Sequence, residues 1–496
     1  MSEVTITAPL RSRFGVSLPI LFALLVYVNV IGLPHHTLED PDTYWHIVLG
    51  RWIIDHAAVP HRDLFSFSMP GAPFVPFEWL AEVAIAAIYD YFGWAGLAAA
   101  AALSAAATLA LLLRLLLRSL APIHALLATA LAWHLISGHI LARPHIFALP
   151  ILVLWTAALV KARDEDRAPP LWLVPLMVLW ANLHGSFIFG LALAALFAVE
   201  ALIAAPDWRS RRRAARSWLL FGALSLLAAL VTPFGIEGLL QPFRLLGMSF
   251  ALSALIEWSS PDFQHYNPLE LWIMVVLVAA FSLQWRLPAT RLIMLLLLLH
   301  MALQHRRHIE ILGLLAPLLL APALARQLED RPGGSRTLQG VDRAIAELKK
   351  PATGLGIAVS LVLFVVLTAA VLPRQRLHMA DDLTPAAALA AVGAHHIDGA
   401  VLNDHAFGGY LIFQGIKVFI DGRADFYGDA FMKRYAQAVT LVSDELPQLL
   451  DQYRIAWTLF APERPAVQML DHLPGWHRLY GDGVAVVHVR DDQTKP

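Results

Sequence analysis

The sequence contains no cysteine, which excludes disulfide bonds, thiolate metal sites and a cysteine nucleophile. Charged residues are also scarce, at 15% of the 496 residues, whereas 58% are hydrophobic and mean hydropathy is +0.60. Soluble globular domains carry roughly a quarter charged residues. The chain has no internal repeat and no low-complexity tract beyond an alanine-rich stretch near 98–110, whose small residues suit close helix packing. This composition predicts a polytopic, α-helical membrane protein.

Eleven apolar runs are interpreted as membrane spans. They lie at about 14–33, 93–117, 122–142, 145–160, 171–183, 186–205, 217–232, 269–284, 289–303, 309–325 and 354–372. Several runs are short, which favours tilted or broken helices. The first run is long for a signal-peptide core and no small-residue cleavage site follows it, so we expect a retained signal anchor.

Basic residues are distributed unevenly among the short loops that join these runs. The richer set of loops holds Arg114 and Arg118, then Lys161, Arg163 and Arg167, then Arg209, Arg211, Arg212, Arg213 and Arg216, then Arg286 and Arg291, and finally the basic residues from Arg326 to Lys350. The positive-inside rule therefore predicts a cytoplasmic N-terminus in a bacterial inner membrane, with the loop at 35–92 outside. An odd number of spans also puts the C-terminal segment outside, in the periplasm.

The segment 374–496 changes from membrane-helix composition to a soluble α/β pattern. Strands are expected at Ala400–Asn403, Lys417–Asp421, Ala456–Phe460 and Val484–Val489, and helices near 429–440 and 444–453. A segment of this length suffices for one small domain. We therefore expect a transmembrane domain over 1–372, a cytoplasmic linker over 326–353 and a periplasmic α/β domain over 374–496.

Acidic residues cluster where the first apolar run ends, in Glu39-Asp40-Pro41-Asp42. Ionised side chains beside hydrocarbon are costly unless they are solvated, paired or used. Asp42 and His46 lie four residues apart and would share one face of a helix lying in the membrane interface. Asp40, Asp42 and His46 also offer ligands for a divalent cation, magnesium or manganese, although they equally suit a solvated helix start. Glu78 opens a further helix, where the helix dipole alone favours an acid.

Further polar residues gather in loops expected outside. They are Arg143 after the third run, Asn182 and His184 after the fifth, and Arg306, Arg307 and His308 before the tenth. Guanidinium groups match phosphate oxygens bidentately, so the three arginines are expected to hold a phosphate, with the histidines as additional donors. The alternatives are that Arg306 and Arg307 anchor lipid headgroups, and that Asn182 and His184 join helices through hydrogen bonds.

One turn of the C-terminal segment, Asp421-Gly422-Arg423-Ala424-Asp425, follows an apolar strand-like run. Loops at strand ends commonly carry function. We therefore expect Arg423 to bind an acceptor or to belong to a lid. The alternative is that Arg423 and Asp421 pair only to fix the turn.

Six strings along the chain carry a family resemblance. They are Asp40-Pro-Asp42-Thr-Tyr-Trp-His46, Glu78-Trp-Leu80, Trp180-Ala-Asn-Leu-His-Gly185, Thr232-Pro-Phe-Gly235, Glu257-Trp258 and Phe419-Ile-Asp-Gly-Arg-Ala-Asp425. With the acidic end of the first span, the long first outer loop, the many-helix body and the C-terminal α/β domain, the layout resembles the GT-C superfamily of polytopic glycosyltransferases over essentially the whole chain. The strings look like a bacterial subgroup of it.

The resemblance implies transfer of a sugar from a polyprenyl-phosphate donor, usually with inversion, to a lipid, glycan or protein acceptor. One acid among Asp40 and Asp42 would then be the general base. The motif is Asp-Pro-Asp instead of the adjacent Asp-Glu pair of the protein-mannosyltransferase branch, which leaves open which carboxylate acts. Glu78 and His46 are near enough in sequence to orient the acceptor or to replace one acid. Metal dependence varies within the superfamily and does not carry over.

Two other classes of function remain open. A transporter or flippase for a lipid-linked glycan would also have many spans, but with polar residues near the bilayer midplane and commonly with repeat symmetry. A non-catalytic subunit of envelope-glycan assembly would explain the C-terminal domain but not the acids of the first loop. Glycosyl transfer needs a carboxylate for the acceptor and cations for the departing phosphate, and the outer loops offer both. The expected partners are the lipid-linked donor, the acceptor and membrane lipids, without nucleic acid.

Overall fold

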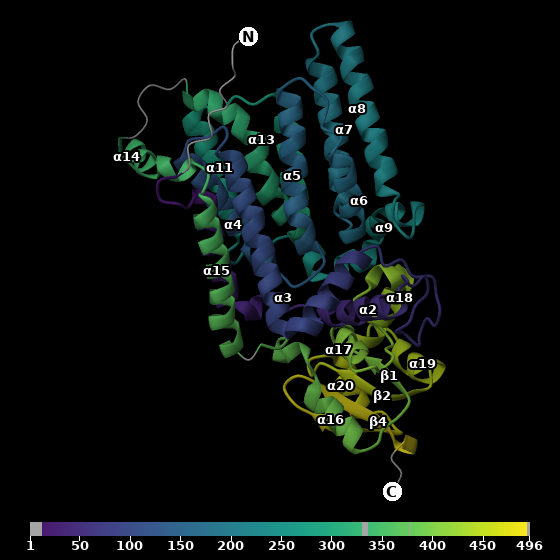
Figure 1. Ribbon diagram of the computed structural model, residues 1–496. Coiled ribbons are helices and arrows are strands. Elements are labelled where there is room, and N and C mark those ends of the chain that lie inside the picture. Colours follow the sequence, from purple (N-terminus) through teal and green to yellow (C-terminus); the bar gives the residue numbers. More distant parts are fainter. Residues whose placement is uncertain (1–11, 330–335, 376, 494–496) are drawn as a thin grey trace, which may run out of the picture.

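The computed structural model describes residues 12–329, 336–375 and 377–493. It consists of a body of long helices and, at one end of that body, a smaller domain formed by the C-terminal part of the chain (Figure 1). The extreme N-terminus, predicted to be cytoplasmic, lies outside the described residues, as does the middle of the expected linker, at 330–335.

All eleven predicted apolar runs are helical in the described part of the chain. They form α1 (Leu18–Gly32), α3 (Trp79–Leu116), α4 (Pro122–Ile136), α5 (His145–Asp164), α6 (Leu173–Leu183), α7 (Phe187–Ala204), α8 (Trp208–Ala229), α11 (Pro268–Leu283), α12 (Ala289–Gln304), α13 (Ile309–Glu329) and α15 (Gly354–Val371). Five described segments are long and apolar enough to cross a membrane: Trp79–Leu116, His145–Asp164, Phe187–Ala204, Arg306–Leu328 and Gly354–Val371. The mostly helical membrane-protein architecture is therefore confirmed.

Small residues let α3 pack closely in the centre of the body, against α1 and α5. Its buried alanines include Ala98, Ala101, Ala102, Ala105 and Ala106. The helix bends at Gly93, whose φ of +61° is accessible to glycine at little cost. Figure 1 shows α2 (Asp42–His56) and the first part of α3 lying between the long helices and the C-terminal domain.

Both faces of α2 are covered by protein, which differs from the interfacial helix expected. Trp45 and Leu49 pack into a buried cluster with Val401 of the C-terminal domain. On another side of the helix, the His46 and Glu82 side chains are each only 1% exposed and their Nδ1 and Oε1 atoms are 3.2 Å apart. The helix thus joins the C-terminal domain to α3, and His46 does not face outward.

The C-terminal domain contains a four-stranded mixed sheet. Its strands are β1 (Ala400–Asn403), β2 (Ile455–Phe460), β3 (Trp476–Gly481) and β4 (Val486–Arg490), in the order β1-β2-β4-β3. β1 and β2 are parallel, whereas β4 runs antiparallel to both of its neighbours. The helices are α16 (Ala386–Ala394), α17 (Gly408–Phe413), α18 (Ala424–Val439), α19 (Glu445–Gln452) and α20 (Pro465–Leu470). The small C-terminal sheet that the sequence predicts is confirmed.

The predicted strand at Lys417–Asp421 does not form. Val418 instead exchanges backbone hydrogen bonds with the first loop, donating to the Phe65 carbonyl and accepting from the Phe67 amide, both at 3.0 Å. The Asn403 Oδ1 atom accepts from the Phe419 amide at 2.9 Å. The apolar run is therefore used to attach the first loop to the C-terminal domain. Conversely, β3 forms although no strand was predicted there.

Short helices occupy the remaining connections. They include α9 (Ile236–Leu246), α10 (Ser249–Ala254), η3 (Ile256–Trp258), η4 (Arg306–His308) and, last, α14 (Arg336–Ile345). The last of these lies within the segment expected as a linker. Figure 1 shows α14 and the beginning of α8 at the end of the body away from the C-terminal domain. The first loop and the C-terminal domain share the other end, as the distribution of basic residues predicts.

Candidate active site

Arg143 joins the two acids of the first loop. Asp40 lies just before α2, and its Oδ1 atom accepts a hydrogen bond of 2.9 Å from the Asp42 amide. The Arg143 Nη1 atom lies 2.9 Å from Asp40 Oδ2, and Nη2 lies 3.0 Å from Asp42 Oδ2. Arg143 comes from the connection between α4 and α5, so one guanidinium holds two carboxylates from a distant part of the chain.

The surroundings of Asp42 favour the protonated form of its carboxyl group more strongly than the surroundings of an acid at the protein surface do. Burial raises the pKa of the Asp42 carboxyl to about 7, against the opposing charge of Arg143 and with further repulsion from Asp40 and Glu257. A carboxylate with such a pKa is well matched to accept a proton near neutral pH. The C-terminal domain contributes to this burial, because Gly422 lies directly against the Asp42 carboxylate.

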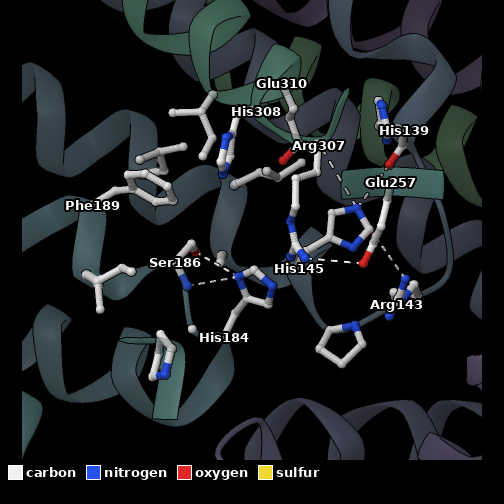
Figure 2. A pocket seen from close by; sticks show the side chains of 18 of the residues that line it. His139, Arg143, His145, His184, Ser186, Phe189, Glu257, Arg307, His308 and Glu310 are labelled. Atoms are coloured by element: carbon white, nitrogen blue, oxygen red, sulfur yellow. Dashed lines mark hydrogen bonds and ion pairs between the residues drawn. The ribbon is translucent and has the colours of Figure 1, made fainter. Parts of the chain in front are cut away.

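A cavity of about 220 Å³ opens on the other side of Arg143. Its polar lining consists of Glu78, His139, Arg143, His145, His184, Ser186, Glu257, Arg307, His308 and Glu310. Its apolar walls include Leu149, Leu152, Ile188, Phe189, Leu245, Met301 and Ile311. Figure 2 shows Arg143, His145, His184 and Arg307 converging on one region, with Phe189 at the opposite side. The cavity therefore has a polar end that contains two guanidinium groups, and an apolar remainder.

Two guanidinium groups share one carboxylate at the polar end. Arg307 Nη1 lies 3.2 Å from Glu257 Oε1, and Arg143 Nη1 lies 3.3 Å from Glu257 Oε2. Arg307 also stacks over the Trp258 ring, with its central carbon 4.4 Å from the ring centre. Burial opposes ionisation of Glu257, but the charges of Arg307 and Arg143 outweigh it and lower the pKa of that carboxyl to about 2. Glu257 is therefore ionised.

Glu78 ends a chain of polar contacts that begins at Trp180. The Trp180 indole donates to Ser186 Oγ at 2.9 Å, and both the Ser186 hydroxyl and amide approach His184 Nδ1, at 2.8 and 3.2 Å. Since the amide can only donate, Nδ1 is the acceptor and the imidazole proton resides on Nε2. That nitrogen lies 3.3 Å from Glu78 Oε1.

The charge states of this chain follow from its burial. Burial lowers the pKa of His184, and nearby positive charges lower it further, so the imidazole stays neutral. Burial raises the pKa of Glu78 to about 7, although Arg143, Arg307 and a hydrogen bond from the backbone at Gly185 oppose the rise. Glu78, like Asp42, is therefore poised to exchange a proton near neutral pH.

Four of the other residues that line the polar end were not among the predicted site residues. They are His139, His145, Glu257 and Glu310. His145 Nε2 lies 3.0 Å from the His139 carbonyl and 3.9 Å from Glu310 Oε2. The clustering of His139 and Glu257 in the predicted outer loops was an available signal, whereas Glu310 begins an apolar run. His308, which was predicted, also lines the cavity.

Two predicted binding residues have their polar atoms engaged elsewhere. The Asn182 side chain accepts from Trp79 Nε1 at 2.7 Å and donates to the Val178 and Val231 carbonyls at 2.8 and 2.9 Å. These bonds fit the interhelical alternative. His46 faces Glu82 away from the cavity. Neither side chain reaches the polar end of the cavity.

Arg306 and Arg307 are neighbours with different settings. Arg307 lines the cavity, whereas Arg306 does not. The Arg306 backbone amide donates to the Ser259 carbonyl at 3.0 Å, which helps to dock η3 on η4. Only Arg307 is therefore placed to meet a ligand in the cavity.

Arg423 is buried in an ion cluster between the first loop and the C-terminal domain. Its guanidinium bonds Asp421 Oδ1 and Oδ2 at 2.8 and 2.7 Å and Asp63 Oδ1 at 2.8 Å. It also lies between the Phe74 and Phe426 rings, 4.9 and 4.7 Å from their centres. With its side chain 1% exposed, Arg423 fits a structural role instead of the predicted contact with an acceptor.

The predicted cation ligands do not assemble into a metal site. Among the described residues, no group of three or more His, Cys, Asp or Glu side chains is arranged to hold a metal ion. Asp40 and Asp42 are oriented by Arg143, and His46 turns to Glu82. These three side chains are therefore not arranged to bind one metal ion together.

Comparison with known proteins adds information at the level of fold. No protein-family model matches the chain, and no curated protein matches it in sequence. ArnT from Cupriavidus metallidurans, solved bound to undecaprenyl phosphate, is similar in structure with a TM-score of 0.52 and 13% identity, over 97% of this chain and 98% of that one. The archaeal oligosaccharyltransferase AglB from Archaeoglobus fulgidus, in complex with an inhibitory peptide and a dolichol-phosphate, has a TM-score of 0.52 and 11% identity, over 89% of this chain and 69% of that one.

This chain has the GT-C fold. The resemblance inferred from the sequence is thereby confirmed for the fold, across almost the whole chain. At 11 to 13% identity, the likeness does not carry individual residue roles from those structures to this one. The roles of the site residues rest on the geometry of this chain itself.

Proposed function

We propose that this protein transfers a sugar from a polyprenyl-phosphate-linked donor to a lipid, glycan or protein acceptor. The observation that carries the proposal is the cavity, in which a polar end with two guanidinium groups joins apolar walls beside ionisable carboxylates. A lipid-linked phosphate presents the complementary pattern of one anionic group on a long hydrocarbon chain. The ligands named for the similar structures, undecaprenyl phosphate and a dolichol-phosphate, support this class of donor.

The donor phosphate is proposed to bind between Arg143 and Arg307. Both guanidiniums line the polar end, and they come from opposite sides of Glu257. Guanidinium stabilises the charge that grows on a departing phosphate. The isoprenoid chain would lie along the apolar walls, for example against Leu149 and Phe189. His184 borders the same space with its Nε2 proton, whereas His308 lines the cavity but directs its Nδ1 proton to the Met301 carbonyl, at 3.3 Å.

The acceptor hydroxyl is proposed to lose its proton to one carboxylate. Its oxygen forms the new bond to the anomeric carbon as the bond from that carbon to the phosphate oxygen breaks, and the polyprenyl phosphate leaves. A single displacement inverts the anomeric configuration and needs no enzyme nucleophile. The bases best matched in pKa are Glu78, which lines the cavity, and Asp42, which shares the Arg143 guanidinium with Asp40.

The reaction is proposed to take place at the outer face of a bacterial inner membrane. The basic loops favour a cytoplasmic end away from the C-terminal domain. The transmembrane part would then comprise 1–372, with a cytoplasmic linker at 326–353 and a periplasmic domain at 374–496. Alkaline phosphatase fused near Asp404 should be active, and an inactive fusion would reverse the orientation.

An assay of donor cleavage tests the proposed reaction. Purified protein is incubated with polyprenyl-phosphate sugars and extracts of envelope glycans and lipids, and release of the polyprenyl phosphate is measured together with the glycosylated product. Acceptor-dependent release supports transfer. Movement of an intact donor across a vesicle membrane without cleavage would point to a flippase, and neither activity would favour an assembly subunit.

A further inference from the structure

The anionic position between Arg143 and Arg307 is filled by a side chain of the protein. Glu257 places one carboxylate oxygen on each guanidinium, at 3.3 Å from Arg143 and 3.2 Å from Arg307. Figure 2 shows both contacts as dashed lines at the polar end of the cavity. The geometry is that of a phosphate bridging two cations, with a carboxylate in its place.

Glu257 is held less firmly than the buried acids elsewhere in the chain. Its side chain is 33% exposed and makes one contact with each guanidinium, whereas Asp421 is fully buried and bonds Arg423 through both oxygens. A carboxylate that retains solvent access can exchange its contacts with the two guanidiniums for contacts with water.

The backbone around Glu257 is anchored independently of its carboxylate. His305 Nδ1 lies 2.5 Å from the Trp258 carbonyl, and the Arg306 amide donates to the Ser259 carbonyl. The Trp258 ring also stacks with Arg307. The Glu257 side chain can therefore rotate away from the guanidiniums while η3 remains docked on η4.

Charge explains why a tethered anion would be useful at this position. Without Glu257, Arg307 would lose its carboxylate partner and Arg143 would keep only Asp40 and Asp42, so the two guanidiniums at a membrane would attract the phosphate of any lipid. A side chain that competes for the same position lowers the apparent affinity of every phosphate ligand by the same factor. Abundant phospholipids that gain little from the cavity are then left unbound, while a ligand that also fills the apolar walls still binds.

We propose that Glu257 is an internal competitor for the phosphate, which sets the affinity threshold that a lipid phosphate must exceed to bind between Arg143 and Arg307. The inference rests on the proposed function for the identity of the natural ligand. It does not depend on that function for the competition itself, which any phosphate lipid reports.

The test compares binding of two lipid phosphates to purified full-length protein in zwitterionic nanodiscs. The probes are undecaprenyl phosphate and phosphatidylglycerol, with undecaprenol as the probe that lacks a phosphate. Glu257→Gln removes the charge and keeps the size of the side chain. Glu237→Gln is the matched control, because Glu237 is an exposed acid of α9 that does not line the cavity. Thermal unfolding verifies that all proteins are folded.

Glu257→Gln should tighten binding of both phosphate probes by roughly tenfold, the effect of removing one competing charge-assisted contact, and Glu237→Gln should leave both unchanged. Equal or weaker phosphatidylglycerol binding by folded Glu257→Gln protein would overturn the competition. Failure of the wild type and of Glu257→Gln to bind undecaprenyl phosphate better than undecaprenol would instead overturn the proposed donor. Failure of the competition is thus detected with phosphatidylglycerol, whereas failure of the proposed donor is detected by comparing undecaprenyl phosphate with undecaprenol.

Discussion

Gly422 of the C-terminal domain lies against the carboxylate of Asp42. A Cβ atom added at Gly422 would lie 1.7 Å from Asp42 Oδ1 and 2.5 Å from its Cγ atom. No side chain larger than hydrogen fits there without moving one of the two residues. The contact makes the C-terminal domain part of the environment that orients and buries the acid proposed as a base.

Gly422→Ala should therefore lower sugar transfer by roughly 10- to 100-fold, because displacing a reacting group by about 1 Å has effects of this size. The rate of product formation and the midpoint of thermal unfolding are measured together. Gly393→Ala is the control, since Gly393 lies in α16 of the same domain and a Cβ atom there would meet nothing within 4 Å. Equal rates for Gly422→Ala and wild type would show that sugar transfer does not depend on the placement of the Asp42 carboxylate against Gly422.

Charge removal at the first-loop acids tests the base directly. Asp40→Asn and Asp42→Asn keep the shape of each side chain, and at least one should lower the transfer rate by roughly 10²-fold, the usual scale for losing a general base. Asp55→Asn is the control, because Asp55 is an exposed acid of the same helix, α2. Full activity in both single variants and in the double variant would refute the assignment.

The pH profile should show ionisation of a carboxyl group near neutrality. Asp42 and Glu78 each have a pKa of about 7, so kcat/KM should rise as pH increases through 7 and the base loses its proton. Stability should change in the opposite direction. Because the folded pKa exceeds the unfolded value of about 4, the folded state binds the extra proton, and stability should fall as pH rises from about 4 to 7. Asp42→Asn and Glu78→Gln should each reduce that fall in unfolding midpoint.

Arg307 and its neighbour Arg306 provide a test and a matched control for the proposed phosphate site. Arg307→Ala should weaken binding of undecaprenyl phosphate by roughly 10-fold or more, since a charge-assisted contact is lost. Arg307→Lys should restore little, because an ammonium lacks the planar fork of guanidinium. Arg306→Ala should bind like wild type, since Arg306 does not line the cavity. Equal loss in both alanine variants would indicate general attraction of anionic lipid instead of a defined site.

The sequence predicts the helical body well because hydropathy is a local property of each apolar run. It also singles out Arg143 and Arg307, which line the cavity, because guanidinium chemistry limits what such residues do beside a membrane. Their binding of a phosphate stays a prediction. It does not distinguish a polar residue that lines a cavity from one whose bonds are satisfied inside protein, which is why His46 and Asn182 were grouped with the site. Arg143 bonds Glu257 from 114 positions away, and separations of this kind leave no local pattern.

Arg423 does not line the cavity, and its contacts lie between distant parts of the chain. It bonds Asp63, which is 360 positions away in the sequence, and its close neighbour Asp421, inside a set of aromatic rings. Both acids therefore lose their cationic partner if Arg423 is removed. Arg423→Ala should destabilise the protein by about 3 to 5 kcal/mol, the range for breaking a buried ion pair on one side.

Chemical or thermal unfolding of the purified protein measures the effect of Arg423→Ala, and limited proteolysis shows whether the C-terminal domain detaches from the first loop. Arg490→Ala is the control, because its pair with Asp451 lies at the surface of the same domain and Asp451 is 80% exposed. We expect the control to unfold like wild type. An Arg423→Ala protein with unchanged stability but no acceptor turnover would instead support the role expected from the sequence, in which this guanidinium contacts the acceptor.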